Sequence, residues 1–224
     1  MSNWYLWIIC AGVPLIFGLV AQMMVKRTFA KYSEMRPANG MTGADAAAAV
    51  LRESGLSGLT INPIPGHLTD HYDPRKRTLN LSVDVGQASS VAAIGVAAHE
   101  AGHAIQDSAH YWPMRFRQNL VPVANIGSSL WFMPVFLGLI LQQTGLVTIG
   151  LVLFAAVVLF QLVTLPVEFD ASRRALVALE HQGLLASSEM DGARAVLRAA
   201  ALTYIAGFVA ALGQLIYFFL VSRN

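Results

Sequence analysis

Residues 145–165 read GLVTIGLVLFAAVVLFQLVTL, an apolar run without a single charged side chain. A helix needs about 20 apolar residues to cross the hydrocarbon core of a bilayer, and this run has that length. Residues 119–142, NLVPVANIGSSLWFMPVFLGLILQ, form a second uncharged run, and only a short Gln-Thr-Gly turn separates the two. The two runs therefore predict an antiparallel hairpin of membrane-spanning helices.

Two further uncharged runs lie toward the ends of the chain, at residues 4–24 and 202–221. A cleaved signal peptide begins with a positive segment, but no Lys or Arg precedes the first run, so we expect a retained span. The composition agrees with four spans. The chain is 55% hydrophobic and only 12% charged, about half the charge of a typical soluble domain.

The basic residues are unevenly distributed along the chain. Of the 15 Lys and Arg residues, 14 lie within residues 25–118 and 166–201, and only Arg223 follows the last run. Positive residues favour the cytoplasmic side of a membrane, so we expect a multi-pass protein of the cell membrane with its polar part in the cytoplasm. The expected divisions are a first transmembrane helix (1–25), a cytoplasmic domain (26–118), a transmembrane hairpin (119–166), cytoplasmic helices (167–201), and a fourth transmembrane helix with its tail (202–224).

The polar segments show their own local patterns. Thr42 is placed to cap a helix that Gly55 ends, and residues 89–108 form another helical segment with Ser89 or Ser90 as cap. Short runs rich in β-forming residues lie between these helices, at 59–64, 68–72 and 78–83. They predict a small antiparallel sheet, and two more helices are expected at 168–182 and 187–201. The expected fold class is a predominantly α membrane protein with four transmembrane helices and a small α+β cytoplasmic domain.

The second polar helix contains His99-Glu100-Ala101-Gly102-His103. Two histidines four residues apart project from one face of a helix and can reach one Zn²⁺ at about 2.0–2.1 Å. The intervening glutamate then acts as a general base on zinc-bound water, which is the H-E-x-x-H pattern. Buried in an apolar helix without a metal, these groups would be costly to desolvate. The sequence therefore predicts His99 and His103 as zinc ligands and Glu100 as the catalytic base.

Catalytic zinc needs a third protein ligand and one open position. The candidates are His110, on the same helix face if the helix persists seven residues beyond His103, His67 and His71 in the sheet region, and Glu168 and Asp170 after the third span. A free carboxylate is least stable close to the apolar span, which favours Glu168 as the ligand and leaves Asp170 as a hydrogen-bond partner of a ligand histidine. The metzincin spacing is excluded, because Gln106 and Ala109 stand where that class has glycine and histidine.

Four segments together resemble the YugP-like family of membrane zinc metallopeptidases: Gly66–Pro74, Leu79–Ser82, Ala98–Gln106 and Leu165–Arg173. The resemblance implies a zincin-like domain with a glutamate third ligand, here Glu168. A wider similarity to M48-type membrane peptidases implies an aspartate four residues after that ligand, where this chain has Ser172. In such peptidases a sheet edge holds the extended substrate, so the strand at 68–72 or 78–83 is the expected counterpart. His71, Tyr72, Arg173 and Arg174 remain open as residues that stabilise the oxyanion.

The expected function is that of a metalloendopeptidase that acts on protein or peptide substrates and is surrounded by membrane lipid. Two alternatives to this function remain. A site-2-type intramembrane protease would pair the motif with a later aspartate, for which the chain offers only Asp191-Gly192. A non-catalytic helical scaffold with a structural metal site would have four protein ligands. The net charge of +2 gives no indication of nucleic-acid binding, and a single cysteine, Cys10, excludes an internal disulfide.

Overall fold

The computed structural model describes residues 4–223. They divide into two compact units. The apolar unit comprises residues 4–22, 112–166 and 202–223, and the polar unit comprises residues 23–111 and 167–201. Each unit is described by itself.

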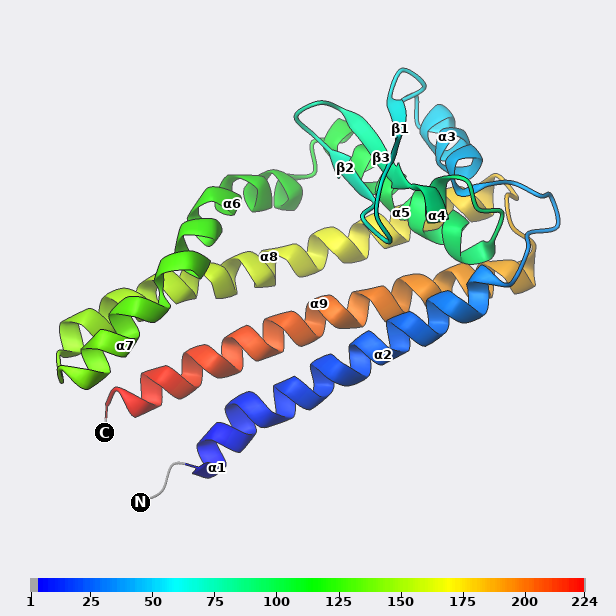
Figure 1. Ribbon diagram of the computed structural model, residues 1–224. Coiled ribbons are helices and arrows are strands. Elements are labelled where there is room, and N and C mark those ends of the chain that lie inside the picture. The colour runs from blue at the N-terminus through cyan, green and yellow to red at the C-terminus, as the bar shows by residue number, and fades with distance from the viewer. Residues whose placement is uncertain (1–3, 224) are drawn as a thin grey trace. The chain divides into compact units, whose positions relative to one another are not determined.

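Helices dominate the chain, and their order is shown in Figure 1. Their bounds are α1 Trp4–Trp7, the π-helical η1 Ile8–Gly12, α2 Val13–Ser33, α3 Gly43–Glu53, α4 Val83–Gly86, α5 Val91–Ser108, α6 Trp112–Leu130, α7 Phe132–Ile140, α8 Thr144–His181 and α9 Ser187–Val221. Four helical segments within the described residues are long and apolar enough to cross a membrane: Trp4–Ser33, Trp112–Ile140, Thr144–His181 and Ser187–Val221. The four expected spans are thus present in position and composition.

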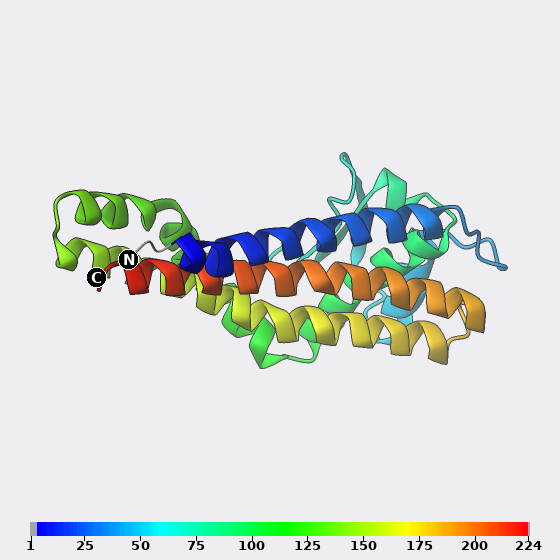
Figure 2. The same cartoon turned by 90° about the horizontal axis from the view of Figure 1, so that it is seen from below.

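Small residues let the helices of the apolar unit approach closely, as is common between helices in lipid. A side chain at Gly150 would meet the backbone of α7, and one at Gly138 would meet the start of α8, so α7 and α8 form the expected hairpin. Gly213 of α9 faces the backbone of Cys10 in η1 in the same way, and these two segments run side by side in Figure 2. Many of the large apolar side chains elsewhere on these helices are exposed, as expected for surfaces that face lipid.

The helices expected at 168–182 and 187–201 are not separate helices. They are the polar ends of α8 and α9, which continue without interruption from the apolar segments. Pro166 lies inside α8, where it removes one backbone donor. Good helix formers occur within the next turns, at Ala171, Arg173, Arg174 and Ala175, and no glycine follows before Gly183, so the helix continues.

The polar unit is built around α3 and α5. Thr42 caps α3 in a capping box with Asp45, and Ser90 caps α5 by accepting a hydrogen bond from the Ala93 amide, so both predicted helix starts are confirmed. The contact faces of both helices consist largely of buried alanine and valine. Small side chains on both helices allow a close approach, and the sheet lies beside α5 in this unit (Figure 1).

The sheet has three strands, β1 Thr60–Ile64, β2 His71–Asp73 and β3 Thr78–Ser82, in the order β1-β3-β2. The prediction of an antiparallel sheet was wrong, because β1 pairs with β3 in parallel and only β2 pairs with β3 antiparallel. Pro63 explains why β1 lies at an edge of the sheet, since proline has no amide hydrogen to donate in the hydrogen-bond ladder of a central strand. β3, the central strand, is buried over almost its whole length.

The strand expected at 68–72 is shorter than predicted and begins only at His71. Leu68 has a left-handed φ of 54°, which a strand does not allow. The Asp70 side chain accepts hydrogen bonds from both the amide and the hydroxyl of Ser82. This side-chain contact takes the place of ladder pairing before β2, and residues 68–70 lie outside the strand.

Candidate metal centre

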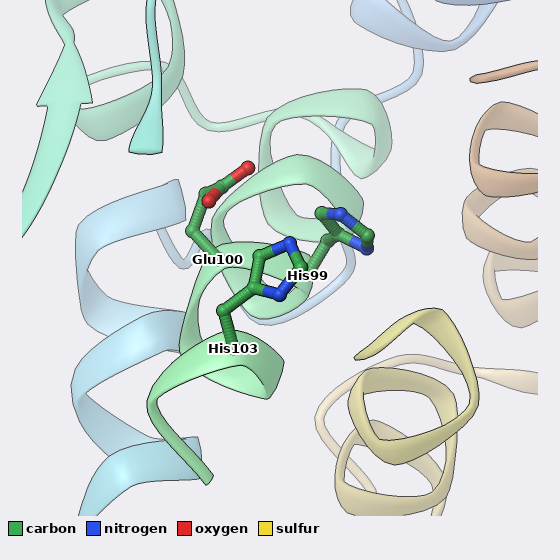
Figure 3. A group of neighbouring side chains, drawn as sticks. All are labelled: His99, Glu100 and His103. Carbon is green, nitrogen blue, oxygen red and sulfur yellow. The ribbon is translucent and has the colours of Figure 1, made fainter. Parts of the chain in front are cut away.

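Helix α5 carries His99, Glu100 and His103, whose nitrogen and oxygen atoms all lie within 4.8 Å of one another. Figure 3 shows the two imidazoles one turn apart and the Glu100 carboxylate beside them. The ring centroids of the histidines are 4.8 Å apart. This is the arrangement that the four-residue spacing predicts, and the group can hold a metal ion.

Glu168 of α8 brings a carboxylate to the same point. Its Oε2 lies 3.2 Å from His99 Nε2 and 3.6 Å from His103 Nε2, and its side chain is only 3% exposed. Metal–ligand bonds of about 2.05 Å in a tetrahedron place neighbouring ligand atoms about 3.3 Å apart. The distances from the two histidine nitrogens to the Glu168 oxygen are therefore close to those around one tetrahedral Zn²⁺.

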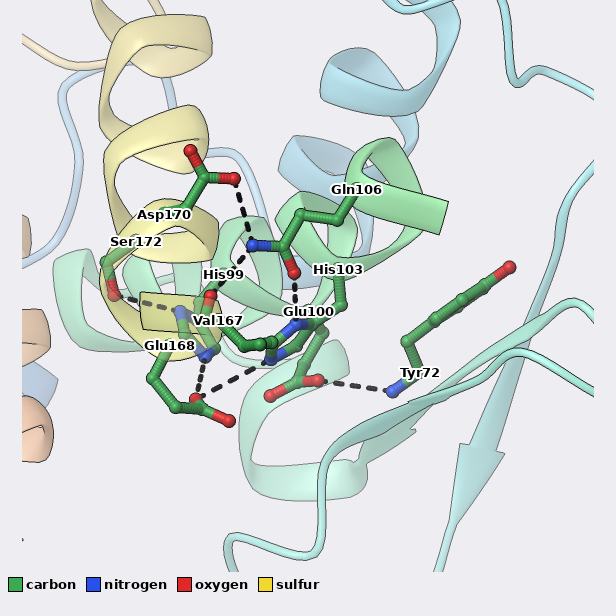
Figure 4. Close-up of polar contacts among 9 residues, drawn as sticks. All are labelled: Tyr72, His99, Glu100, His103, Gln106, Val167, Glu168, Asp170 and Ser172. Atoms are coloured by element: carbon green, nitrogen blue, oxygen red, sulfur yellow. Dashed lines mark hydrogen bonds and ion pairs between the residues drawn. The ribbon is translucent and has the colours of Figure 1, made fainter. Parts of the chain in front are cut away.

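Both histidines are oriented through their other ring nitrogen (Figure 4). His99 Nδ1 lies 3.0 Å from Ser172 Oγ, and His103 Nδ1 lies 3.0 Å from Gln106 Oε1. When Nδ1 carries the proton and donates in these contacts, the lone pair of Nε2 is directed to the metal position. Ser172 thus serves the histidine at the place where the wider resemblance implied an aspartate.

Gln106 connects His103 to α8. Its Nε2 donates to the Val167 carbonyl at 2.8 Å and to Asp170 Oδ2 at 3.0 Å. Because both hydrogens of the amide are used in this way, its oxygen must face His103, and His103 Nδ1 must be the donor. Asp170 contacts Gln106, Arg173 and Arg174, so its effect on a histidine is indirect rather than the direct contact that was expected.

Sequence reasoning did not single out Gln106 as a partner of the site. Its position could have indicated this role, because Gln106 follows His103 by three residues and therefore lies on the same helix face. Its side chain is fully buried, and buried polar groups are nearly always hydrogen-bonded. A glutamine at this spacing inside an apolar helix indicates a specific partner.

The Glu100 carboxylate is held by the sheet. The Tyr72 amide of β2 donates to its Oε2 at 3.1 Å, and Figure 4 shows this contact with the tyrosine ring directed away from it. Burial raises the pKa of Glu100, although the neighbouring histidines oppose the shift. Burial lowers the pKa of His103, but the Glu168 and Glu100 carboxylates outweigh it and raise that pKa overall. A carboxyl group with a raised pKa is a better proton acceptor than an exposed one.

The oxyanion candidates occupy different places. The Tyr72 hydroxyl donates to Asp107, and burial together with this carboxylate raises the pKa of Tyr72 to about 12. His71 is exposed and contacts the Thr69 carbonyl and the Asn80 side chain. Arg173 is also exposed and pairs with Asp170, while Arg174 pairs with the same carboxylate and lies over the ring of Tyr111.

The other histidine candidates for a third ligand lie apart from the cluster. Helix α5 ends at Ser108, and His110 follows in left-handed backbone with a φ of 54°. Its predicted place on the α5 face is therefore not realised. His67 pairs with Asp84 at 2.7 Å and meets the ring of Phe29 edge to face. Neither histidine is a member of the group that could hold a metal ion among the described residues.

Gly102 allows α5 and α8 to approach at the site. A Cβ at this position would lie 2.4 Å from the carbonyl oxygen of Ala171, a separation that real structures do not show. The segment that occupies the space beside Gly102 is α8. The close approach of α8 is what brings Glu168 and Ser172 to the histidines.

We expect Gly102→Ala to lower both stability and zinc content. The added methyl must push α8 away, and overpacking of this kind costs about 1–3 kcal/mol. Thermal unfolding in detergent and metal analysis of the purified protein measure the two effects. Gly145→Ala is the matched control, because a Cβ there meets nothing within 4 Å. Equal melting temperature and zinc content in wild type and Gly102→Ala would contradict this role.

The fold and the site define a helical protein with four candidate membrane spans and a His-Glu-x-x-His group that can hold a metal ion. The family described as "Putative neutral zinc metallopeptidase" matches residues 7–223, and the chain belongs to this family. Zn²⁺ is accordingly its metal. The chain is also 41% identical over 204 residues to the "Putative membrane protease YugP" of Bacillus subtilis (strain 168), with 91% of each chain covered. This confirms the YugP-like resemblance and the membrane localisation. No solved structure matches the chain significantly.

Proposed function

We propose that the protein is a membrane-embedded zinc metalloendopeptidase in which His99, His103 and Glu168 hold the metal and Glu100 is the general base. The observation that carries the proposal is the approach of two Nε2 atoms to one Glu168 oxygen, at distances of 3.2 Å and 3.6 Å that suit tetrahedral zinc. Three protein ligands leave a fourth position open, as catalytic zinc requires. The family membership supports the same activity.

Bound zinc supplies a Lewis acid and lowers the pKa of its water to about 7. The chain's own groups transfer the proton and hold the catalytic side chains in place. Glu100 accepts the proton of the attacking water and delivers it to the leaving amine. The Tyr72 amide keeps the carboxylate in place, while Ser172 and Gln106 hold the imidazoles.

The edge of β2 next to Glu100 is the proposed place for an extended substrate. Residues 78–83 do not qualify, because β3 is paired on both sides. The Tyr72 amide points to Glu100 and therefore away from β3, so the outer edge of β2 faces the site. Strand addition at such an edge fixes a peptide by main-chain hydrogen bonds. The short strand offers few of them, so side-chain contacts must contribute to specificity.

We further propose that the protein crosses the membrane four times with its polar unit in the cytoplasm. The four apolar helices and the distribution of Lys and Arg support this orientation. Cysteine substitutions at exposed Arg52 and at Ser222 test it in intact cells. We expect a membrane-impermeant thiol reagent to label the Ser222 variant and to spare the Arg52 variant, and the reverse pattern would contradict the orientation.

A structural metal site is the second candidate, because the Glu100 carboxylate belongs to the same group of atoms as the two histidines. If Glu100 binds the metal together with Glu168, the site is closed with four protein ligands. The site-2-type alternative has less support. Asp191 is exposed and pairs with Arg194, and Gly192 packs against Tyr32, so this dipeptide has a structural environment of its own.

We expect Gln106→Leu to lower zinc affinity by about 10–100-fold, because loss of a group that orients a ligand histidine has effects of this size. Gln106→Glu should recover part of the loss, since its carboxylate can still accept from His103 Nδ1. Competition with a chromogenic chelator measures the affinity directly. Gln87→Leu, at an exposed position, is the control. Unchanged affinity in Gln106→Leu would show that Gln106 does not orient the site.

A further inference from the structure

The polar ends of α8 and α9 enclose a groove of about 370 Å³, whose lining borders the metal centre at Ser172. A short turn joins the two helices, from His181 to Ser187 (Figure 1). The apolar part of the lining includes Phe169, Leu176 and Leu197. Phe169 is 42% exposed, so the groove presents an apolar surface that the polar unit itself leaves uncovered.

The groove also has a positive rim. Three arginines line it, Arg173, Arg194 and Arg198, against a single carboxylate, Glu180. Arg173 and Arg194 each form an ion pair within their own helix. Arg198 is exposed and forms no ion pair within residues 4–223. A groove that combines an exposed apolar side chain with a guanidinium group outside any ion pair of the described residues suits a ligand with acyl chains and a phosphate.

The end of the groove nearest the uncharged runs, at Phe169 and Arg198, lies at the depth of the headgroup layer of a bilayer. The uncharged run of α9 begins at Leu202, so Arg198 precedes it by about 6 Å at 1.5 Å per residue. The headgroup layer extends about 5–7 Å beyond each side of the hydrocarbon core. Phe169 follows the uncharged run of α8 by a similar distance. Arginine side chains near a helix end extend toward this layer.

We propose that this groove binds an anionic phospholipid, with the phosphate on Arg194 and Arg198 and the acyl chains against the exposed ring of Phe169. Guanidinium groups bind phosphate by paired, charge-assisted hydrogen bonds. A zwitterionic lipid gains less from the excess positive charge, so the site distinguishes lipids by charge. The proposal does not depend on peptidase activity, and a Glu100→Gln protein is expected to bind the lipid as wild type does.

The test compares the full-length zinc-loaded protein with an Arg194→Gln/Arg198→Gln variant in detergent, by native mass spectrometry during titration with phosphatidylglycerol or phosphatidylcholine. Loss of one arginine near a charged lipid surface lowers the affinity for the lipid about fivefold. The double variant should therefore bind phosphatidylglycerol roughly 30-fold more weakly than wild type. Arg52→Gln/Arg75→Gln removes the same charge from exposed positions elsewhere in the polar unit and should bind as wild type does.

Equal phosphatidylglycerol affinity in the double variant and wild type, or equal affinity of wild type for both lipids, would overturn the proposal. Glycerol phosphate separates a lipid site from a phosphate site, because it lacks acyl chains. We expect it not to displace phosphatidylglycerol at equal concentration, and displacement would also overturn the proposal. If the double variant does not fold, Arg198→Gln alone serves, with an expected loss of about fivefold.

Discussion

Replacement of Glu100 by glutamine is expected to lower peptide hydrolysis by about 10²–10⁴-fold while the bound zinc stays at the wild-type level. A general base contributes a factor of this size, and glutamine cannot accept the proton. In the wild type the Tyr72 amide donates a hydrogen bond to the Glu100 carboxylate. The side-chain oxygen of glutamine can still accept this hydrogen bond, so the fold should be retained. The measurement is cleavage of an unfolded protein substrate by purified protein, together with metal analysis of the same sample.

The matched control is Glu34→Gln, which removes an equal charge at an exposed position and should leave both quantities unchanged. Two results would contradict the assignment of Glu100. Cleavage at the wild-type rate would show that it is not the base. Loss of zinc would show that it is a ligand, as the closed structural site requires.

Replacement of Glu168 by glutamine is expected to remove zinc from the protein. The amide is neutral and a much weaker ligand, so the affinity should fall by more than the roughly 100-fold upper value for residues that only orient a ligand. Cleavage should fall with zinc occupancy and recover in part when zinc is added in excess. Chelator competition gives the affinity, and cleavage over a zinc titration gives the recovery.

Glu180 lies on the same helix as Glu168 and is exposed. Glu180→Gln is therefore the control for a change of charge in α8. An unchanged zinc affinity in Glu168→Gln would remove Glu168 from the metal and leave the third ligand to another residue. A decrease in zinc affinity no larger than that of Gln106→Leu would instead indicate that Glu168 only orients a ligand histidine.

Local patterns were sufficient to predict most of the helices. The membrane spans follow from uncharged runs of sufficient length, because the backbone in lipid must satisfy its own hydrogen bonds as a helix. The caps at Thr42 and Ser90 follow from side chains that accept the first free amides. The continuity of α8 through Pro166 was not predicted, because a proline and a charged cluster are also typical of a helix end.

Contacts between distant segments were harder to predict. Alternating residues identify strands but not their order, and the parallel pairing of β1 with β3 depends on how the intervening turn folds back. The links from Gln106 to Val167 and from His99 to Ser172 join positions more than 60 residues apart. They exist only because Gly102 lets α8 approach, and no pattern within either helix encodes that approach.

The central claim is a zinc centre with two histidines, Glu168 and one open position. A structure of the zinc-loaded protein at a resolution that shows the ligands tests it most directly. We expect zinc on His99 Nε2, His103 Nε2 and a Glu168 oxygen, with a water in the fourth position and Glu100 hydrogen-bonded to that water. Zinc bound directly by Glu100 as a fourth protein ligand, or zinc without Glu168, would contradict the account.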